Sequence, residues 1–128
     1  MPRLARFFWV GTIVFWCGLF IATHLPPARV PVLPVSDKTE HLVSYATLAL
    51  GLFTSITLMR RRDAGGRAQL AIRVLAICLA YGAIDEWTQI PVGRSCELPD
   101  WYADAAGAGT MMVVATLVSG AMSGDEAR

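Results

Sequence analysis

The sequence predicts an all-α protein, an integral membrane four-helix bundle with a Pro-rich extracytoplasmic loop after its first helix. The first observation is composition: 55% of the 128 residues are apolar and 16% are charged, against roughly 25% charged residues in soluble proteins. The second is that four apolar runs are each long enough to cross a bilayer as a helix. The third is that the polar residues gather between these runs. The length fits a single domain, residues 1–128.

The first helix is expected at about residues 7–23, a run of seventeen residues without charge. Such a helix is roughly 25 Å long, short but able to span a bilayer. A cleaved signal peptide is the alternative, because Arg3 and Arg6 precede an apolar core. However, this core is long and aromatic, and no clear small-residue cleavage site follows it. Residues 25–36 then contain four prolines, which exclude a helix and predict an extended, polyproline-like segment.

Three further helices are expected, at about residues 37–59, 68–90 and 100–121. Ser36 or Asp37 begins the second helix, and Asp37 and Glu40 have the spacing of an N-terminal capping pair. The third ends before Pro91, because a residue that precedes proline disfavours the helical conformation. A loop at residues 91–99, with two prolines and a glycine, connects it to the fourth helix.

The positive charges are distributed unevenly about the predicted spans. Apart from Arg128 in the C-terminal tail, seven lie at one end of the helices and three at the other. By the positive-inside rule, this predicts a multi-pass protein of the bacterial inner (plasma) membrane with both termini in the cytoplasm, and the lipid bilayer is the expected partner. The cytoplasmic set is Arg3, Arg6, Arg60, Arg61, Arg62, Arg67 and Arg73; the outer set is Arg29, Lys38 and Arg94.

Two other classes of protein are excluded by composition. No basic stripe with interleaved aromatic residues is present, so no nucleic-acid partner is expected. Cys17 and Cys78 lie inside apolar runs, and only Cys96 lies in a polar loop. These positions imply no disulfide framework, and the absence of a C-x-x-C pair excludes a zinc ribbon or a thioredoxin motif.

The stretch from Asp85 to Asp104 holds five of the chain's ten carboxylates. Charge between two apolar runs must lie at a membrane surface, because burial in hydrocarbon is unfavourable. The topology brings a second polar segment, residues 37–45, to the same surface, and helical spacing places each segment's polar residues on one stripe. The candidate site residues are Asp37, Lys38, His41 and Tyr45 on the second helix, Asp85, Glu86 and Gln89 on the third, Arg94 in the loop, and Asp100 and Asp104 on the fourth.

Several of these residues have a purely structural alternative. Asp37 and Asp100 could be helix caps, since acidic residues favour helix N-termini. His41 could be a polar interfacial residue, and Tyr45 an ordinary core or interfacial aromatic. Arg94 could contact lipid phosphates without specificity.

Asp85 and Glu86 are harder to explain structurally. They lie near the C-terminal end of a helix, where the helix dipole disfavours anions, and they adjoin the hydrocarbon boundary. Asp104 lies one turn inside an apolar helix, near the small-residue pair Ala103 and Gly107, which could serve close helix packing only. Acids within a membrane usually face a partner or a polar cavity, so we favour a functional polar site.

Four motifs occur in a fixed order: Asp37-Lys38-x-x-His41-x-x-x-Tyr45, Asp85-Glu86-x-x-Gln89, Gly93-Arg94-Ser95 and Asp100-x-x-x-Asp104-x-x-Gly107. In order and spacing they resemble the VanZ-like membrane protein family, over about residues 37–109. Each motif is weak alone, and the ordered set is more specific. The family usually has Asn at the position of Asp104, so a carboxylate is added here. The resemblance implies a cell-envelope protein with a link to glycopeptide (teicoplanin) resistance.

The residue types favour a site that acts on, or binds, a lipid-linked or phospholipid headgroup. Arg94 and Lys38 would hold an anionic headgroup. His41, oriented by Asp37 or another carboxylate, would act as general base or nucleophile. The expected substrate-binding residues are Asp37, Lys38, Tyr45, Gln89, Arg94, Asp100 and Asp104.

The other two expected catalytic residues are carboxylates. Glu86 or Asp85 would act as an acid, or would bind a divalent cation with Asp100 and Asp104. Two histidines in the chain are few for a zinc site, so no metal ligands are assigned and the cofactor stays open.

Two non-enzymatic functions remain as alternatives. In the first, the same residues form a recognition pocket of a non-catalytic envelope or accessory protein. In the second, the protein is a small transporter, since acids near a membrane often mark ion paths. The second is disfavoured because the acids lie at one face, and the inner halves of the helices offer few polar residues for a conduit.

Overall fold

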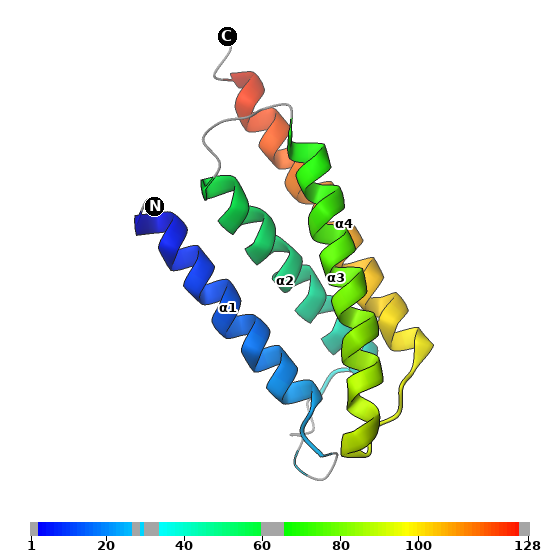
Figure 1. The fold of residues 1–128 in the computed structure, drawn as a ribbon. Coiled ribbons are helices and arrows are strands. Elements are labelled where there is room, and N and C mark those ends of the chain that lie inside the picture. The colour runs from blue at the N-terminus through cyan, green and yellow to red at the C-terminus, as the bar shows by residue number, and fades with distance from the viewer. Residues whose placement is uncertain (1–2, 27–28, 30–33, 60–65, 126–128) are drawn as a thin grey trace.

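Four long helices follow the four apolar runs of the sequence (Figure 1). In this computed structural model, residues 3–26, 29, 34–59 and 66–125 are described, with side chains as far as residue 121. The elements are α1 (Arg3–Thr23), α2 (Asp37–Met59), α3 (Arg67–Gln89), the short 3₁₀ helix η3 (Ile90–Val92) and α4 (Leu98–Asp125). No strand occurs in the described part of the chain, which confirms the all-helical prediction.

The helix bounds agree with the predicted ones for α2 and differ elsewhere. α1 begins at Arg3 rather than residue 7, because nothing in the intervening residues opposes a helix. α4 begins at Leu98 rather than residue 100. Pro99 is tolerated there because backbone N–H groups in the first turn of a helix have no acceptor within the helix, so the N–H that proline lacks breaks no hydrogen bond. The predicted loop at 91–99 is therefore shorter, and η3 forms its first part.

Two segments of the prediction fall largely outside the described residues. Of the Pro-rich segment 25–36, residues 27, 28 and 30–33 are not described, so its extended conformation stays a prediction. The same holds for the basic turn between α2 and α3, of which residues 60–65 are not described.

The start of α2 corrects one sequence expectation. Ser36 caps this helix: its hydroxyl accepts a hydrogen bond from the Thr39 N–H at 3.2 Å, and its carbonyl accepts from the N–H groups of Thr39 and Glu40. The expected capping pair of Asp37 and Glu40 is therefore wrong. Asp37 is instead the first helical residue, and its carboxyl group is left for contacts outside the cap.

α2 lies at the centre of the packing and has its most extensive contact with α4. The core includes Leu48 and Leu52 of α2, Val74 of α3 and Met112 of α4. α2 and α4 approach closely at Gly107, where a Cβ would overlap the backbone carbonyl of Leu42. This close approach shows that Gly107 serves helix packing, and it places the first half of α2 beside the first half of α4.

The outer surface of the bundle is apolar. Large side chains such as Phe7, Ile72 and Leu117 are about two-thirds exposed or more, and only 11% of the α1 span is buried. All four helices are long and apolar enough to cross a membrane. An apolar exterior with acidic side chains buried between the helices is the arrangement of a multi-pass membrane protein.

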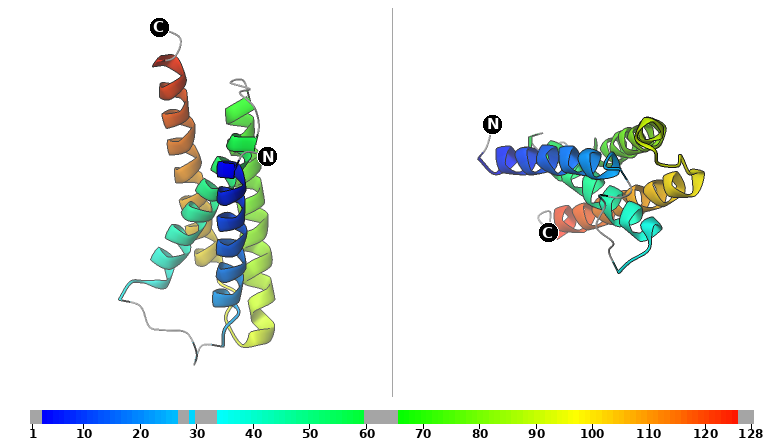
Figure 2. Two further views of the ribbon diagram at one scale, coloured as in Figure 1. Left: turned by 90° about the vertical axis from the view of Figure 1, so that its left-hand side faces the viewer. Right: turned by 90° about the horizontal axis from the view of Figure 1, so that it is seen from below.

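The two ends of the bundle differ in what they contain. α1 begins and α4 ends at one end (Figure 1; Figure 2, left). The start of α2, the end of α3 and the start of α4 meet at the opposite end. The polar segments of the sequence are therefore brought together there, as expected.

Candidate functional site

Three buried polar side chains from three helices meet at this end of the bundle. They are His41 of α2, Glu86 of α3 and Asp104 of α4, with exposed fractions of 7%, 4% and 1%. One nitrogen or oxygen atom from each lies within 4.8 Å of the others. We call these three residues the His41 cluster. Its members come from all three predicted motif helices, so the helices do converge on one polar site.

The shortest contact in the His41 cluster joins His41 Nδ1 to Asp104 Oδ1 at 2.9 Å. With the carboxylate as acceptor, the ring proton lies on Nδ1 and leaves the Nε2 lone pair for a base. Two glycines make room for this pair. Gly107 lets α2 and α4 approach, and a Cβ on Gly82 of α3 would lie only 2.9 Å from Asp104 Oδ2.

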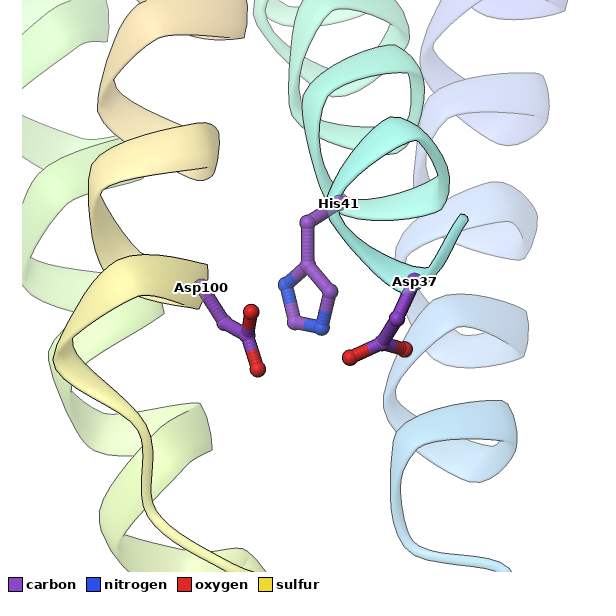
Figure 3. Close-up of side chains that lie close together, drawn as sticks. All are labelled: Asp37, His41 and Asp100. Atoms are coloured by element: carbon purple, nitrogen blue, oxygen red, sulfur yellow. The ribbon is translucent and has the colours of Figure 1, made fainter. Parts of the chain in front are cut away.

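Two further carboxylates flank the imidazole, one on each side. In Figure 3 the ring of His41 lies between the carboxyl groups of Asp100 and Asp37, with one ring nitrogen turned toward Asp37. One ligand atom from each of these three residues lies within 4.8 Å of the others. Asp100 is buried and Asp37 is exposed, so this group faces the outside of the bundle end.

Asp100 does not act as a helix cap. Its carboxyl group accepts a hydrogen bond from Lys38 Nζ at 3.0 Å, while the carbonyl of Glu97 accepts the N–H groups that begin α4. Lys38 also reaches the carboxyl group of Glu97 at 4.0 Å. Lys38, expected to hold an anionic headgroup, is thus already paired with carboxylates.

Glu86 connects the His41 cluster to a surface pocket. Its Oε2 accepts a hydrogen bond from the backbone N–H of Glu97 at 2.8 Å, which fixes the carboxyl group against the loop before α4. The pocket has a volume of about 370 Å³ and is mostly apolar, within the size range of small-ligand sites. It is lined by Ala83, Glu86, Cys96, Glu97, Leu98 and Trp101.

Asp85 and Gln89 belong to a second network, which ties α1 to α3. Asp85 accepts hydrogen bonds from the Thr23 hydroxyl and from Gln89 Nε2, both at 3.0 Å. His24 Nε2 lies 3.0 Å from the Thr88 hydroxyl. We call these five residues the α1 anchor. The catalytic role expected of Asp85 and the substrate-binding role expected of Gln89 therefore receive no geometric support from their contacts.

Sequence reasoning missed the α1 side of this anchor. Thr23 and His24 end an apolar run, as interfacial polar residues often do, and their spacing gives no sign of a partner. The one available signal was Asp85 itself, because a buried acid at a helix C-terminal end needs hydrogen-bond donors from elsewhere.

Tyr45 is buried, whereas Arg94 is half-buried. Tyr45 is fully buried one turn below His41, its ring stacks on Tyr81 at 5.8 Å, and its hydroxyl has no hydrogen-bond partner among the described residues. The backbone N–H of Arg94 donates to the carbonyl of Gln89 at 3.3 Å. For its guanidinium, no hydrogen bond or ion pair occurs within the described part of the chain.

The site as a whole is acidic. Carboxylates outnumber the basic side chains near it, and Lys38 is the one lysine or arginine that contacts them among the described residues. An anionic headgroup would therefore meet mostly like charge unless another cation is present. The carboxylates are Asp37, Asp85, Glu86, Glu97, Asp100 and Asp104.

No protein-family model, curated protein or solved structure matches this chain. The site is therefore interpreted from its own geometry, and the family resemblance depends on the order of the four motifs.

Proposed function

We propose that the chain is a VanZ-like membrane protein of the bacterial cell envelope. It lies in the inner membrane with both termini in the cytoplasm, and its polar site faces the outer surface. There it binds, and acts chemically on, a lipid-linked or phospholipid headgroup. The family resemblance also connects it with glycopeptide resistance.

One observation carries this proposal: a buried His–Asp pair stands beside a mostly apolar pocket at the end of a membrane bundle. The Nδ1–Oδ1 distance of 2.9 Å orients His41 as a general base, with Asp104 as its positioning carboxylate. Glu86 belongs to the same cluster and also lines the pocket, so it can meet a bound molecule. An amphiphile whose chain enters the pocket would present its polar end to these groups.

The roles of the residues follow from their positions. His41 would take a proton from water or from a headgroup hydroxyl, and Glu86 would return one to the leaving group. Burial of the His41 cluster keeps competing water away and strengthens its electrostatic interactions. Lys38 lies at the mouth of the site, 53% exposed, where it could shift from Asp100 toward an anionic headgroup.

Alkylation of Cys96 tests whether the pocket binds such a ligand. Cys96 is exposed and lines the pocket, whereas Cys17 is exposed on α1 and serves as an internal control. The purified protein in detergent is treated with a maleimide, with and without phosphatidylglycerol or an isoprenyl phosphate. We expect the lipid to slow alkylation of Cys96 and leave Cys17 unchanged. A rate at Cys96 that no lipid lowers would contradict headgroup binding.

Substitution of His41 by Gln separates enzyme from recognition protein. An enzyme loses turnover of the headgroup and keeps much of the Cys96 protection. A recognition protein shows no turnover in the wild type, and the variant loses protection. Altered flux in sealed vesicles, with neither of these effects, would indicate a transporter instead.

The orientation has its own test. Cys96 and a cysteine introduced by Ala121→Cys lie near opposite ends of the bundle, and a Cys17→Ser background removes the control cysteine. In intact cells a membrane-impermeant maleimide should label Cys96 and spare position 121. Labelling of position 121 alone would invert the proposed topology.

A further inference from the structure

We propose that the His41 cluster binds one divalent metal ion of the Zn²⁺ or Mn²⁺ kind. His41, Glu86 and Asp104 would supply one imidazole nitrogen and two carboxylate oxygens. Three protein ligands leave a further coordination position open, which is the arrangement of a catalytic rather than a structural site. That the ion binds is argued from distances, charge and burial. With the ion in place, His41 and Glu86 would be ligands rather than base and acid, and a water on the ion would take over the proton transfer; this role alone rests on the proposed function.

The distances suit such an ion. His41 Nδ1 and Asp104 Oδ1 are 2.9 Å apart, and all three ligand atoms lie within 4.8 Å of one another. Two ligands on a tetrahedral ion with bonds near 2.1 Å are separated by roughly 3.4 Å. The ion can therefore take the place of the proton between His41 and Asp104 with a small adjustment of side chains.

Charge and burial point the same way. Glu86 and Asp104 are at least 96% buried, and burying two carboxylates without compensating charge is strongly unfavourable. A protonated His41 would offset only one of them, and Lys38 is engaged by Asp100 on the exposed side. A divalent cation offsets both.

A second observation comes from Tyr45. Its hydroxyl is fully buried and has no hydrogen-bond partner among the described residues. It lies within electrostatic reach of the Asp104 and Asp85 carboxylates, and its ring edge meets Gly82 at the same place as Asp104 does. Because helical side chains lean toward the N-terminus, Tyr45 is directed from α2 toward the His41 cluster. A water on the open position of the ion would give this hydroxyl its partner.

The choice of metal follows from the donor set. Imidazole favours Zn²⁺ and similar ions, and carboxylates also suit Mn²⁺. Mg²⁺ prefers oxygen ligands and keeps most of its water, so a site with one nitrogen donor and little water access disfavours it. A bound ion would also convert the acidic site into one that accepts a phosphate oxygen, which resolves the charge conflict with an anionic headgroup.

Metal binding is tested on the full chain in detergent, without lipid. After treatment with a chelator and dialysis against Zn²⁺, Mn²⁺ or Mg²⁺, bound metal is measured by mass spectrometry and affinity by calorimetry. We expect about one Zn²⁺ or Mn²⁺ per chain. Glu86→Gln and Asp104→Asn should each weaken binding at least roughly tenfold, since even changes to groups behind the ligands have effects of that size.

Matched controls separate a ligand from a nearby acid. Asp85→Asn removes a buried carboxylate next to Glu86 in sequence, and should leave the affinity within about threefold because Asp85 belongs to the α1 anchor. Asp37→Asn tests the exposed group around His41. Circular dichroism and unfolding establish that each variant is folded. Absence of bound Zn²⁺ or Mn²⁺ in the wild type, or equal losses in Asp85→Asn or Asp37→Asn, would overturn the assignment.

Failure of this inference differs from failure of the proposed function. If lipid still protects Cys96 in the presence of a chelator, the headgroup binds without the ion, and the ion has no part in headgroup binding. One equivalent of Zn²⁺ in a protein that no lipid protects would establish the metal site and remove the proposed ligand.

Discussion

Replacing Gly107 by Ala should separate α2 from α4. A Cβ at this position would overlap the Leu42 carbonyl and lie 2.9 and 3.0 Å from the carbonyl carbon and Cα of Leu42. Carbon atoms pack at about 3.5–4.0 Å, so these two contacts alone require a shift of roughly 0.5–1 Å. The obstructing atoms are backbone, so no side-chain rotation relieves the overlap.

The expected magnitude is the difference between two opposing effects. Overpacking a well-packed interface typically lowers stability by about 1–3 kcal/mol. Replacing Gly by Ala within a helix also raises stability by up to about 1 kcal/mol, because Ala has the higher helix propensity. We expect Gly107→Ala to lower the free energy of unfolding by roughly 1–2 kcal/mol.

Gly109→Ala is the matched control, because it lies on the same helix and a Cβ there meets nothing within 4 Å. Only the propensity gain remains, so this variant should be as stable as the wild type or slightly more so. Both are measured by reversible unfolding in mixed detergent micelles, followed by far-UV circular dichroism. If Gly107→Ala matches Gly109→Ala in stability, the close approach of α2 and α4 is wrong.

The same change should reach the site. Leu42 follows His41 in α2, and Asp104 lies one turn before Gly107 in α4. Separating the helices at Gly107 therefore lengthens the 2.9 Å contact between His41 and Asp104. We expect weaker Zn²⁺ binding in Gly107→Ala and unchanged binding in Gly109→Ala.

Three other substitutions test single contacts, each by the same unfolding measurement. Thr23→Val removes a donor to the buried carboxylate of Asp85 and should lower stability by about 1.5–3 kcal/mol, whereas a variant as stable as the wild type would show the α1 anchor to be unimportant. Trp101→Phe removes the indole N–H that donates to an α3 carbonyl at 3.0 Å, with an expected loss of about 1 kcal/mol. Lys38→Met should lower the unfolding midpoint, because it removes the donor to the buried carboxylate of Asp100; an unchanged midpoint would show that this pair is not stabilising.

The helices could be predicted because their signals are local. Apolar length fixes the spans, and helical spacing predicted that the polar stripes of three helices would face one another. The structure shows which members meet: His41, Glu86 and Asp104. Errors arose where two local signals compete. Pro99 can end a loop or begin a helix, and only the structure shows that it lies in the first turn of α4.

The partners of the charged residues could not be predicted in the same way. Which carboxylate meets Lys38 depends on how α2 and α4 are rotated about their axes, and side-chain packing sets that rotation. Asp100 was considered as a cap for this reason, although it binds Lys38. The link from Thr23 to Asp85 depends on which face of α1 is turned to α3, and α1 has no polar stripe to specify it.

The α1 anchor also bears on how the protein is made. Thr23 and Asp85 are 62 residues apart, so α1 is synthesised well before the carboxyl group to which Thr23 donates a hydrogen bond. Synthesis proceeds from the N-terminus, so α1 can already be in the bilayer when α3 follows. When α3 enters the membrane, the Thr23 hydroxyl would already be in place to donate a hydrogen bond to Asp85, the group that is most costly to bury. In this view α1 contributes more to the assembly of the helices than to the packing of the core.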